Sequence, residues 1–164
     1  MTLAPPLAPL SPGLTEQQRE RYRRQLQLPN FGEAAQQRLL ESSVLVTGVG
    51  GLGGTVALYL AAAGIGQLVL ARGGNLRLDD LNRQVLMRND GVGKLRVDQA
   101  AESLRRFNPE TLVVAVADYV TAENVGGLVA QAEIAVDATR RTMARHRVLN
   151  VMTHLDPWMT IDRE

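Results

Sequence analysis

A glycine-rich turn between a run of β-branched residues and an apolar segment constrains this chain more than any other feature. Residues 48–53 read G-V-G-G-L-G and match the pattern G-x-G-x-x-G, with a predicted strand at 44–47 before them and a predicted helix at 52–63 after them. A turn without side chains lets backbone N–H groups approach a phosphate, and the partial positive charge of the helix N-terminus favours the anion. The alternative is a tight turn that needs glycine only for packing. The pattern predicts a nucleotide-binding turn, whose expected contact residues are Gly48, Gly50, Gly51, Leu52 and Gly53.

Beyond this turn, predicted strands and helices alternate along the chain. Apolar runs at residues 67–71, 112–116, 134–137 and 158–161 predict four further strands, and helices are expected at 94–107, 121–132 and 139–151. Apolar strands separated by helices are typical of a parallel sheet that is covered on both faces. We therefore expect an α/β fold, a single Rossmann-like, doubly wound parallel sheet with the strand order 3-2-1-4-5.

The segment before the first strand has two parts. Residues 1–14 hold four of the seven prolines and are expected to form a disordered tail, without the basic and apolar regions of a signal peptide. Thr15 with Gln18 three residues later is typical of a capping box, which predicts a helix at 15–28, and a second helix is expected at 33–40. Residues 15–43 would thus be N-terminal helices and residues 44–164 a nucleotide-binding domain.

Composition narrows the classes of function. The 164 residues carry a formal net charge of +1, which gives no field to attract nucleic acid or an anionic membrane. The sequence has no cysteine, which excludes a disulfide framework, a thiol nucleophile and a CxxC zinc knuckle, and cytoplasm is the expected compartment. The uncharged stretch 44–71 could span a bilayer, but its glycines favour two strands and a helix instead. His146 and His154 lack partners at metal-ligand spacing, so no metal site is expected, and the acids Asp79 and Asp80 are interpreted as a solvated turn.

Arginines stand where nucleotide-binding proteins often carry acids. At the end of the second strand, where an NAD site has an acid for the ribose, this chain has Arg72, which favours a ligand with a phosphate there, such as NADP. A solvated surface arginine is the alternative. After the fourth strand, Asp137 is followed by Arg140 and Arg141 at a predicted helix start, where the macrodipole disfavours cations. One of these two arginines could face the glycine turn and complete an anion site together with Asp137.

Five motifs, in the same order, resemble the ThiF/MoeB/HesA-type adenylyltransferases of the ubiquitin-activating enzyme superfamily. Residues 21–25 (RYRRQ) resemble the family's RYxRQ, residues 48–70 its nucleotide loop and first helix, and residues 81–84 (LNRQ) the end of its NLxRQ. Residues 91–109 resemble its VGxxK…NP segment, and residues 135–139 (AVDAT) its DxTDN. This joint match covers residues 20–150 and is more specific than any one motif.

The resemblance implies both a fold of the ThiF type and an activity. The family's members bind ATP with magnesium and adenylate the C-terminal glycine carboxylate of a small ubiquitin-like carrier protein. They often act as homodimers in which an N-terminal arginine completes the partner's site. By resemblance the glycine turn would be the phosphate cradle, Arg24 and Arg83 would meet the triphosphate, and Arg96 would stand near the position of the family's VGxxK lysine. Such fixed cations stabilise charge as pyrophosphate leaves.

Several positions depart from the family's pattern. Arg72 and Gly74 stand where the family has two acids, Asp80 replaces the Asn of NLxRQ, and Arg96 replaces the Lys of VGxxK. Arg140 replaces the second Asp of DxTDN, which the family uses near the magnesium, and most members are longer than this chain. These changes favour either a metal-free anion site or a degenerate relative with lost or strongly weakened adenylation.

Three functions therefore stay open at the level of sequence. The first is a nucleotide-binding, adenylyltransferase-like protein with ATP as its ligand and a small ubiquitin-like carrier as its partner. The second is a non-catalytic module that binds and regulates an intact homologue. The third is an NADP-binding protein of the Rossmann type, which depends on Arg72.

Overall fold

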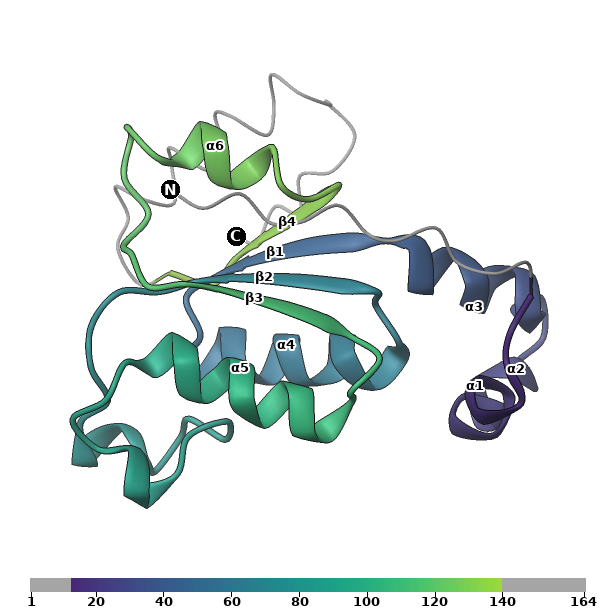
Figure 1. Cartoon of the computed structure of the whole chain (residues 1–164), viewed down its shortest axis with the longest axis horizontal. Helices are drawn as coiled ribbons and strands as arrows, with labels where there is room; N and C mark the ends of the chain where they lie inside the picture. Colours follow the sequence, from purple (N-terminus) through teal and green to yellow (C-terminus); the bar gives the residue numbers. More distant parts are fainter. Residues whose placement is uncertain (1–12, 140–164) are drawn as a thin grey trace.

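The computed structural model describes residues 13–139, and these form a parallel sheet with helices on both of its faces (Figure 1). The strands are β1 (Ser43–Thr47), β2 (Gln67–Ala71), β3 (Leu112–Val116) and β4 (Ile134–Asp137), in the order β3-β2-β1-β4. All three pairings are parallel, as the sequence of strands and crossover helices predicts. The α/β, Rossmann-like prediction is confirmed. The expected fifth strand and the helix at 139–151 lie outside the described residues.

Two helices cover one face of the sheet and one covers the other. Figure 1 shows α4 (Gly51–Ala63) and α5 (Arg96–Phe107) below the strands and the short helix α6 (Val125–Val129) above them. Strand side chains alternate between two apolar clusters, so both faces of every inner strand are buried. The larger cluster, between the sheet and α4 and α5, includes Val44, Val46, Leu68, Leu70, Ala57, Ala61, Val97 and Leu104.

The N-terminal segment is helical, but it is not one helix. The capping box at Thr15 is present, and its helix α1 (Glu16–Arg21) is followed by α2 (Arg23–Leu26) instead of running on to residue 28. The break falls at Tyr22, which is buried and lies against the C-terminal end of α4. Tertiary packing of this one ring therefore interrupts a helix that the local sequence favours. A third helix, α3 (Gly32–Glu41), leads into β1.

Helix α6 is shorter than the helix expected at 121–132. Residues 122–124 form a turn that leads into the helix, in which Asn124 Oδ1 accepts from the backbone N–H of Thr121 at 2.8 Å and the carbonyl of Thr121 accepts from the N–H of Val125 at 3.0 Å. Two short 3₁₀ helices, η1 (Leu78–Asp80) and η2 (Asn89–Gly91), lie within the stretch that the sequence left irregular.

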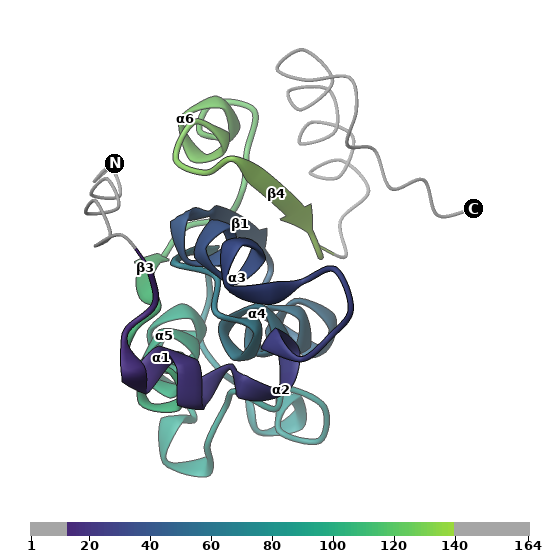
Figure 2. The ribbon, with the colours of Figure 1, turned by 90° about the vertical axis from the view of Figure 1, so that its right-hand side faces the viewer.

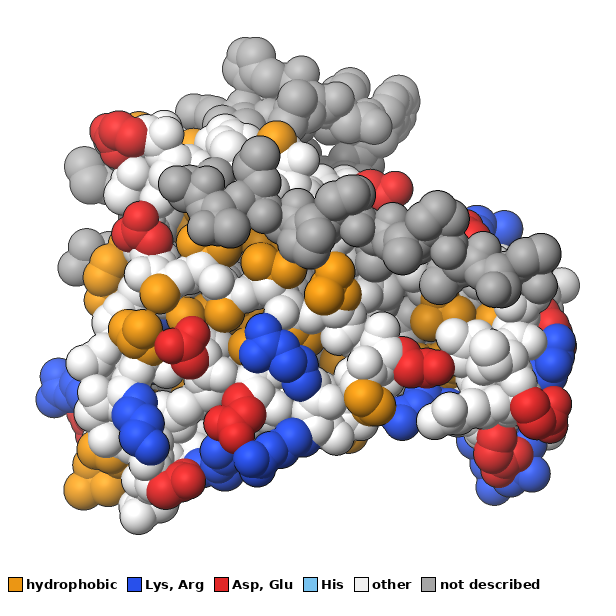
Figure 3. Space-filling view, in the orientation of Figure 1, with side chains coloured by type: hydrophobic (Ala, Val, Ile, Leu, Met, Phe, Trp, Pro, Cys, Tyr) orange, Lys and Arg blue, Asp and Glu red, His pale blue; other side chains and the backbone are white. Residues whose placement is uncertain are grey.

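The N-terminal helices lie at the end of the sheet where the strands begin. Figure 2 shows α1, α2 and α3 together at this end, in front of the sheet. The loops that follow the strands lie at the opposite end (Figure 1). Within residues 13–139, no helix is both long enough and apolar enough to cross a membrane, and the uncharged stretch forms β1, α4 and β2. Figure 3 shows acidic and basic side chains interspersed on one face, in keeping with the near-zero net charge.

Candidate functional site

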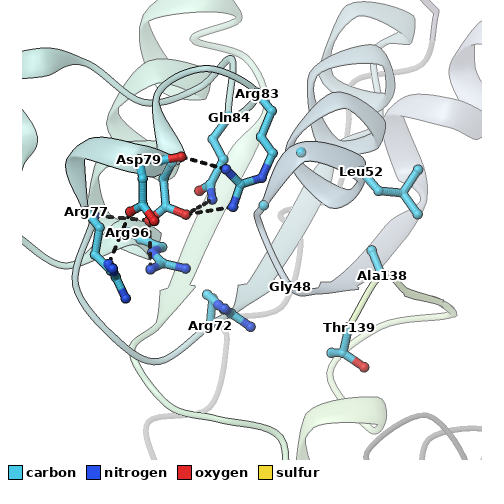
Figure 4. A pocket seen from close by; sticks show the side chains of 13 residues that line it. Gly48, Leu52, Arg72, Arg77, Asp79, Arg83, Gln84, Arg96, Ala138 and Thr139 are labelled. Atoms are coloured by element: carbon cyan, nitrogen blue, oxygen red, sulfur yellow. Dashed lines mark hydrogen bonds and ion pairs between the residues drawn. The ribbon is translucent and has the colours of Figure 1, made fainter. Parts of the chain in front are cut away.

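A pocket of about 580 Å³ lies at the carboxyl ends of the parallel strands, where ligands bind in open α/β sheets (Figure 4). It joins the glycine turn after β1, the residue after β2, the η1 segment, the start of α5 and the residues after β4. Its lining is Gly48, Gly50, Gly51, Leu52, Arg72, Arg77, Asp79, Asp80, Arg83, Gln84, Arg96, Ala138 and Thr139. Most of the residues expected at a nucleotide site therefore border one cavity.

The glycines of the turn serve two different purposes. Gly48 has a φ of +84°, and a Cβ at Gly53 would lie 1.7 Å from the carbonyl oxygen of Gly48, so these two are required by the backbone and by close packing. At Gly50 the nearest heavy atom to an added Cβ is Gln84 Nε2, 3.9 Å away. The fold does not need glycine at position 50. A bare backbone there leaves room for a ligand, whereas Gly53 does not line the pocket.

The N-terminus of α4 opens onto this pocket. Gly50 is the N-cap residue and offers no side chain to the helix, and the first hydrogen bond within the helix runs from the N–H of Gly54 to the carbonyl of Gly50 at 2.8 Å. The N–H groups of Gly51, Leu52 and Gly53 come before it and have no partner within the helix. Exposed N–H groups and the helix dipole together favour an anion at this point.

A carboxylate that the sequence analysis did not place in the site organises the wall formed by η1 and the turn after it. Asp80 is almost completely buried and accepts hydrogen bonds from Arg83 Nη2 at 3.1 Å, Gln84 Nε2 at 2.7 Å and the N–H of Arg77 at 3.0 Å, and pairs with Arg96 Nη2 at 2.8 Å. The interpretation of a solvated turn is therefore wrong for Asp80. The spacing to Arg83 and Gln84, three and four residues on, was the local signal that could have revealed it.

Arg83 and Arg96 differ in how much of their side chains the pocket exposes. The side chain of Arg83 is 41% exposed and also donates to the carbonyl oxygen of Asp79 at 2.7 Å and to Asn82 Oδ1 at 2.9 Å. The side chain of Arg96 is 12% exposed and donates from Nε to the carbonyl oxygen of Asn75 at 3.0 Å. Arg83 is thus the cation of this pair that a ligand can reach more readily.

Arg72 lies directly after β2, and Figure 4 shows its side chain between Arg96 and the turn at Gly48. Its guanidinium group lies over the ring of Tyr119, 5.6 Å from the ring centroid, which is a cation–π contact. Added Cβ atoms at Gly73 and Gly74 would lie 2.6 Å and 2.5 Å from Tyr119 atoms, so Tyr119 packs directly on this backbone. The glycine at 74, where the family has an acid, therefore makes room for the aromatic ring beneath Arg72.

Asp137 ends β4 and supports the turn that closes the pocket. Its Oδ1 accepts from Thr47 Oγ1 at 2.7 Å and from the N–H of Thr139 at 2.9 Å. Its Oδ2 is buried, with no hydrogen-bond partner among the described residues. The next two residues, Ala138 and Thr139, line the pocket. Arg140, predicted to join this site, lies outside the described residues.

The donor set near the pocket fits a magnesium ion only if phosphates supply most of its ligands. Three hydrogen bonds and the ion pair with Arg96 already engage both oxygens of Asp80, and Asp79 pairs with Arg77 at 3.1 Å. Residues 13–139 contain no group of three or more His, Cys, Asp or Glu side chains that could hold a metal. Two described carboxylates could add one ligand to such an ion: Asp137, whose buried Oδ2 has no hydrogen-bond partner among the described residues, and Asp79, which lines the pocket and pairs with Arg77 through Oδ1 alone.

Arg24 does not line the pocket. It is exposed on α2, at the opposite end of the sheet (Figures 1 and 2). Its neighbours in the RYxRQ pattern, Tyr22 and Gln25, are turned inward toward the end of α4. Arg24 could therefore meet a nucleotide only in the pocket of another chain.

The fold and the pocket define a Rossmann-like domain of the nucleotide-binding, adenylyltransferase-like class. The chain belongs to the ThiF family, which matches residues 22–159. It is 58% identical over 132 residues to the heterocyst HesA protein of Trichormus variabilis, covering 80% of this chain and 49% of the relative. It is 38% identical over 128 residues to the adenylyltransferase and sulfurtransferase uba4 of Emericella nidulans, covering 78% of this chain and 27% of that protein. This chain thus spans about half the length of the HesA relative.

The fold is also similar to that of solved structures. E. coli tRNA N6-threonylcarbamoyladenosine dehydratase, TcdA, in complex with ATP superposes with a TM-score of 0.80 at 28% identity. The match covers 87% of this chain and 58% of TcdA. A crystal structure of E. coli MccB matches with a TM-score of 0.70 at 27% identity, over 82% of this chain and 38% of that one.

Proposed function

We propose that this domain binds ATP in the pocket at the carboxyl ends of its strands and takes part in adenylating the C-terminal carboxylate of a small ubiquitin-like carrier protein. The observation that carries the proposal is the open space at Gly50, at the N-terminus of α4 and close to Arg83, which packs against Gly51. The fold has room for a side chain at position 50, but the residue is a glycine. A bare backbone at an anion site fits a ligand that approaches the backbone closely. The ATP complex of the similar TcdA supports a nucleotide as that ligand.

In the proposed reaction, the residues of this chain mainly position and stabilise charge. The N–H groups at the start of α4 hold phosphate oxygens. Arg83, in the turn after η1, contacts the triphosphate with its guanidinium group. A carboxylate oxygen of the carrier attacks the α-phosphorus, the bond to the β-phosphate oxygen breaks, and the electron pair leaves with pyrophosphate. Fixed N–H dipoles and an arginine stabilise the charge that develops on pyrophosphate. Magnesium, if it arrives with ATP, supplies further charge neutralisation, with Asp137 as a candidate protein ligand.

Weak turnover is part of this proposal. Arg140 stands where the family places an acid near the metal, and Arg72 stands where the family places an acid for the ribose. Both exchanges put a cation where the family uses an anion, so we expect ATP binding to survive better than adenylation.

Two measurements test this proposal. The first is ATP binding by calorimetry to the wild-type chain and to Gly50→Asp, whose carboxylate would occupy the anion site. The second is carrier-dependent exchange of labelled pyrophosphate into ATP. Binding with slow exchange is the expected result. Binding with no exchange for any carrier favours the module that partners an intact homologue, and absence of binding to ATP overturns the proposal.

NADP is the second candidate ligand, and the position of Arg72 favours it. The guanidinium group borders the same pocket and is held over Tyr119, where a phosphate on a ribose could meet it. A thermal-shift comparison of ATP, NADPH and NADH separates the two candidates. Stabilisation by NADPH but not by NADH, lost in Arg72→Ala, would replace ATP by NADP as the ligand.

A homodimer is the assembly that we propose. On α4, Leu52 and Tyr59 are seven residues apart and are 61% and 71% exposed, so they share one apolar face of a helix that has almost no polar residue. A second copy that packs on this face would cover it. Arg24 lies at the other end of the sheet from the pocket of its own chain, so it can reach the pocket of another copy but not its own. Light scattering of wild type and Tyr59→Asp tests this, with a monomeric wild type as the contradicting result. The cytoplasmic location expected from the cysteine-free sequence stays a prediction.

A further inference from the structure

Two departures from the family's pattern meet in space. The family has Asn and Lys where this chain has Asp80 and Arg96, and nothing in the sequence alone connects the two exchanges. In the structure Arg96 Nη2 lies 2.8 Å from Asp80 Oδ2, and the two side chains are 12% and 6% exposed. The two departures therefore form one buried contact in this chain, between a carboxylate and a guanidinium group.

Both oxygens of the buried carboxylate have partners. Oδ1 accepts from Arg83 Nη2 and Gln84 Nε2, and Oδ2 accepts from the N–H of Arg77 and forms an ion pair with Arg96. An ion pair that is buried to this degree is costly unless all of its acceptor positions are filled, and breaking it from one side leaves an uncompensated charge. Asp80 thus needs Arg96, and its four partners come from the residue before η1, from the turn after η1 and from the first residue of α5.

The same carboxylate fixes the arginine that faces the pocket. Arg83 is held by Asp80 on one nitrogen and by the carbonyl of Asp79 and Asn82 Oδ1 on the other, which leaves its remaining donors toward the pocket (Figure 4). A guanidinium group that is oriented before the ligand arrives loses less conformational entropy on binding. Arg96, by contrast, has Asp80 and the carbonyl of Asn75 as partners and little exposed surface.

We propose that Asp80 and Arg96 act as one unit, in which Asp80 is a positioning residue for Arg83 and Arg96 is its clamp. On this account Arg83, not Arg96, is the cation that contacts the bound phosphates. The inference rests on the proposed nucleotide function for its binding readout, but the contact between Asp80 and Arg96 can be tested without any ligand.

The test is a double-mutant cycle that restores the family's pair in two steps. The variants are Asp80→Asn, Arg96→Lys and the double exchange, and Tm is measured without ligand. ATP affinity is measured at a temperature about 20 °C or more below the lowest Tm. Every variant is fully folded at that temperature, so a change in Kd does not report unfolding. Each single exchange should lower Tm and raise Kd about fivefold or more, and the double exchange should recover most of both losses.

A matched control pairs Asp80→Asn with Arg88→Lys. Arg88 forms its ion pairs with Asp90 and Glu102, and neither it nor these partners lines the pocket. The effects of this pair should add, because the two sites share no contact. Additive losses for Asp80 and Arg96 would overturn the inference, as would an Asp80→Asn variant whose ATP affinity is unchanged.

The failure of the inference and the failure of the proposed function give different results. If the wild type does not bind ATP, the proposed function is wrong, and the Tm cycle still decides whether Asp80 and Arg96 form one unit. If the wild type binds ATP and the Tm cycle is additive, the function stands and the inference is wrong. If Tm couples but the Kd of Arg96→Ala rises more than that of Arg83→Ala, the pair is structural and Arg83 is not the main phosphate contact.

Discussion

Asn108 donates a hydrogen bond from Nδ2 to the hydroxyl oxygen of Tyr22 at 3.0 Å, although the two residues lie 86 positions apart. The same nitrogen lies 2.8 Å from the carbonyl oxygen of Ala61, and Gln25 and Gln36 both donate to the carbonyl oxygen of Ala63. These carbonyls are among the last of α4, where the regular hydrogen bonds of the helix end, and the carbonyl of Ala61 also accepts from the N–H of Gly64 at 3.2 Å. Residues from the first and fourth of the resembling motifs thus cap the far end of the helix whose N-terminus borders the pocket.

Replacing Tyr22 by Phe tests this contact. The variant keeps the ring but removes the acceptor of the Asn108 bond, so we expect the free energy of unfolding to fall by about 1 kcal/mol. Urea unfolding at neutral pH measures it, and ATP binding should be unchanged because Tyr22 does not line the pocket. A loss of ATP affinity would contradict the assignment of Tyr22 to structure.

The Tyr22 hydroxyl also predicts a pH dependence. Burial raises the pKa of Tyr22 above its usual value, since the ionised form would lose its hydration. The folded chain then holds this proton more tightly than the unfolded chain, so the stabilisation is complete below the unfolded pKa of about 10 and is lost as the pH rises above it. The free energy of unfolding is measured for wild type and for Tyr22→Phe from pH 8 to pH 11. The difference between the two should shrink as the pH rises. A constant difference would contradict the burial argument.

Gly50 and Gly53 should respond in opposite ways to alanine. Gly50→Ala has space for its Cβ and should change stability by less than about 1 kcal/mol, but the methyl group enters the pocket and should weaken ATP binding about tenfold. Gly53→Ala places its Cβ against the carbonyl oxygen of Gly48 and should destabilise the fold by about 3 kcal/mol. Thermal unfolding and calorimetry measure both. Equal ATP affinity for Gly50→Ala and wild type would argue against a ligand at the turn.

Removing Arg83, one of the cations that line the pocket, should weaken nucleotide binding without unfolding the chain. Arg83→Ala loses a charge-assisted contact worth about 1.5–3 kcal/mol, so we expect ATP affinity to fall at least tenfold. Arg106→Ala is the matched control, because Arg106 is an exposed arginine that pairs with Glu102 and does not line the pocket. Equal losses in the two variants would mean that only overall charge matters.

Asp137 should decide how far magnesium contributes. Its Oδ2 is buried and has no hydrogen-bond partner among the described residues. Asp137 directly precedes Ala138 and Thr139, which line the pocket. If a magnesium ion arrives with ATP, Asp137→Asn should abolish the difference between ATP affinity in magnesium and in EDTA, while leaving metal-free binding within about threefold. Wild-type affinity that is equal in magnesium and in EDTA would instead favour the metal-free anion site.

Local sequence patterns are enough to predict the strands and the glycine turn. The strands at 67–71, 112–116 and 134–137 were predicted with the bounds that the structure has, because short apolar runs that alternate with helices are typical of a parallel sheet covered on both faces. The turn was equally readable, since a positive φ at Gly48 and the close packing at Gly53 are local requirements that only glycine meets.

The burial and the partners of the charged and polar residues depend on contacts that form only in the folded chain. Asp79 and Asp80 are neighbours with the same charge, yet one is exposed and the other is buried among donors from separate segments. The break at Tyr22 and the placement of Arg24 away from the pocket likewise depend on contacts with α4. An apolar run is buried because its own side chains avoid water, so the local sequence is enough to predict its burial. The burial of an ionised group depends on partners from elsewhere in the chain, and no local pattern specifies these partners.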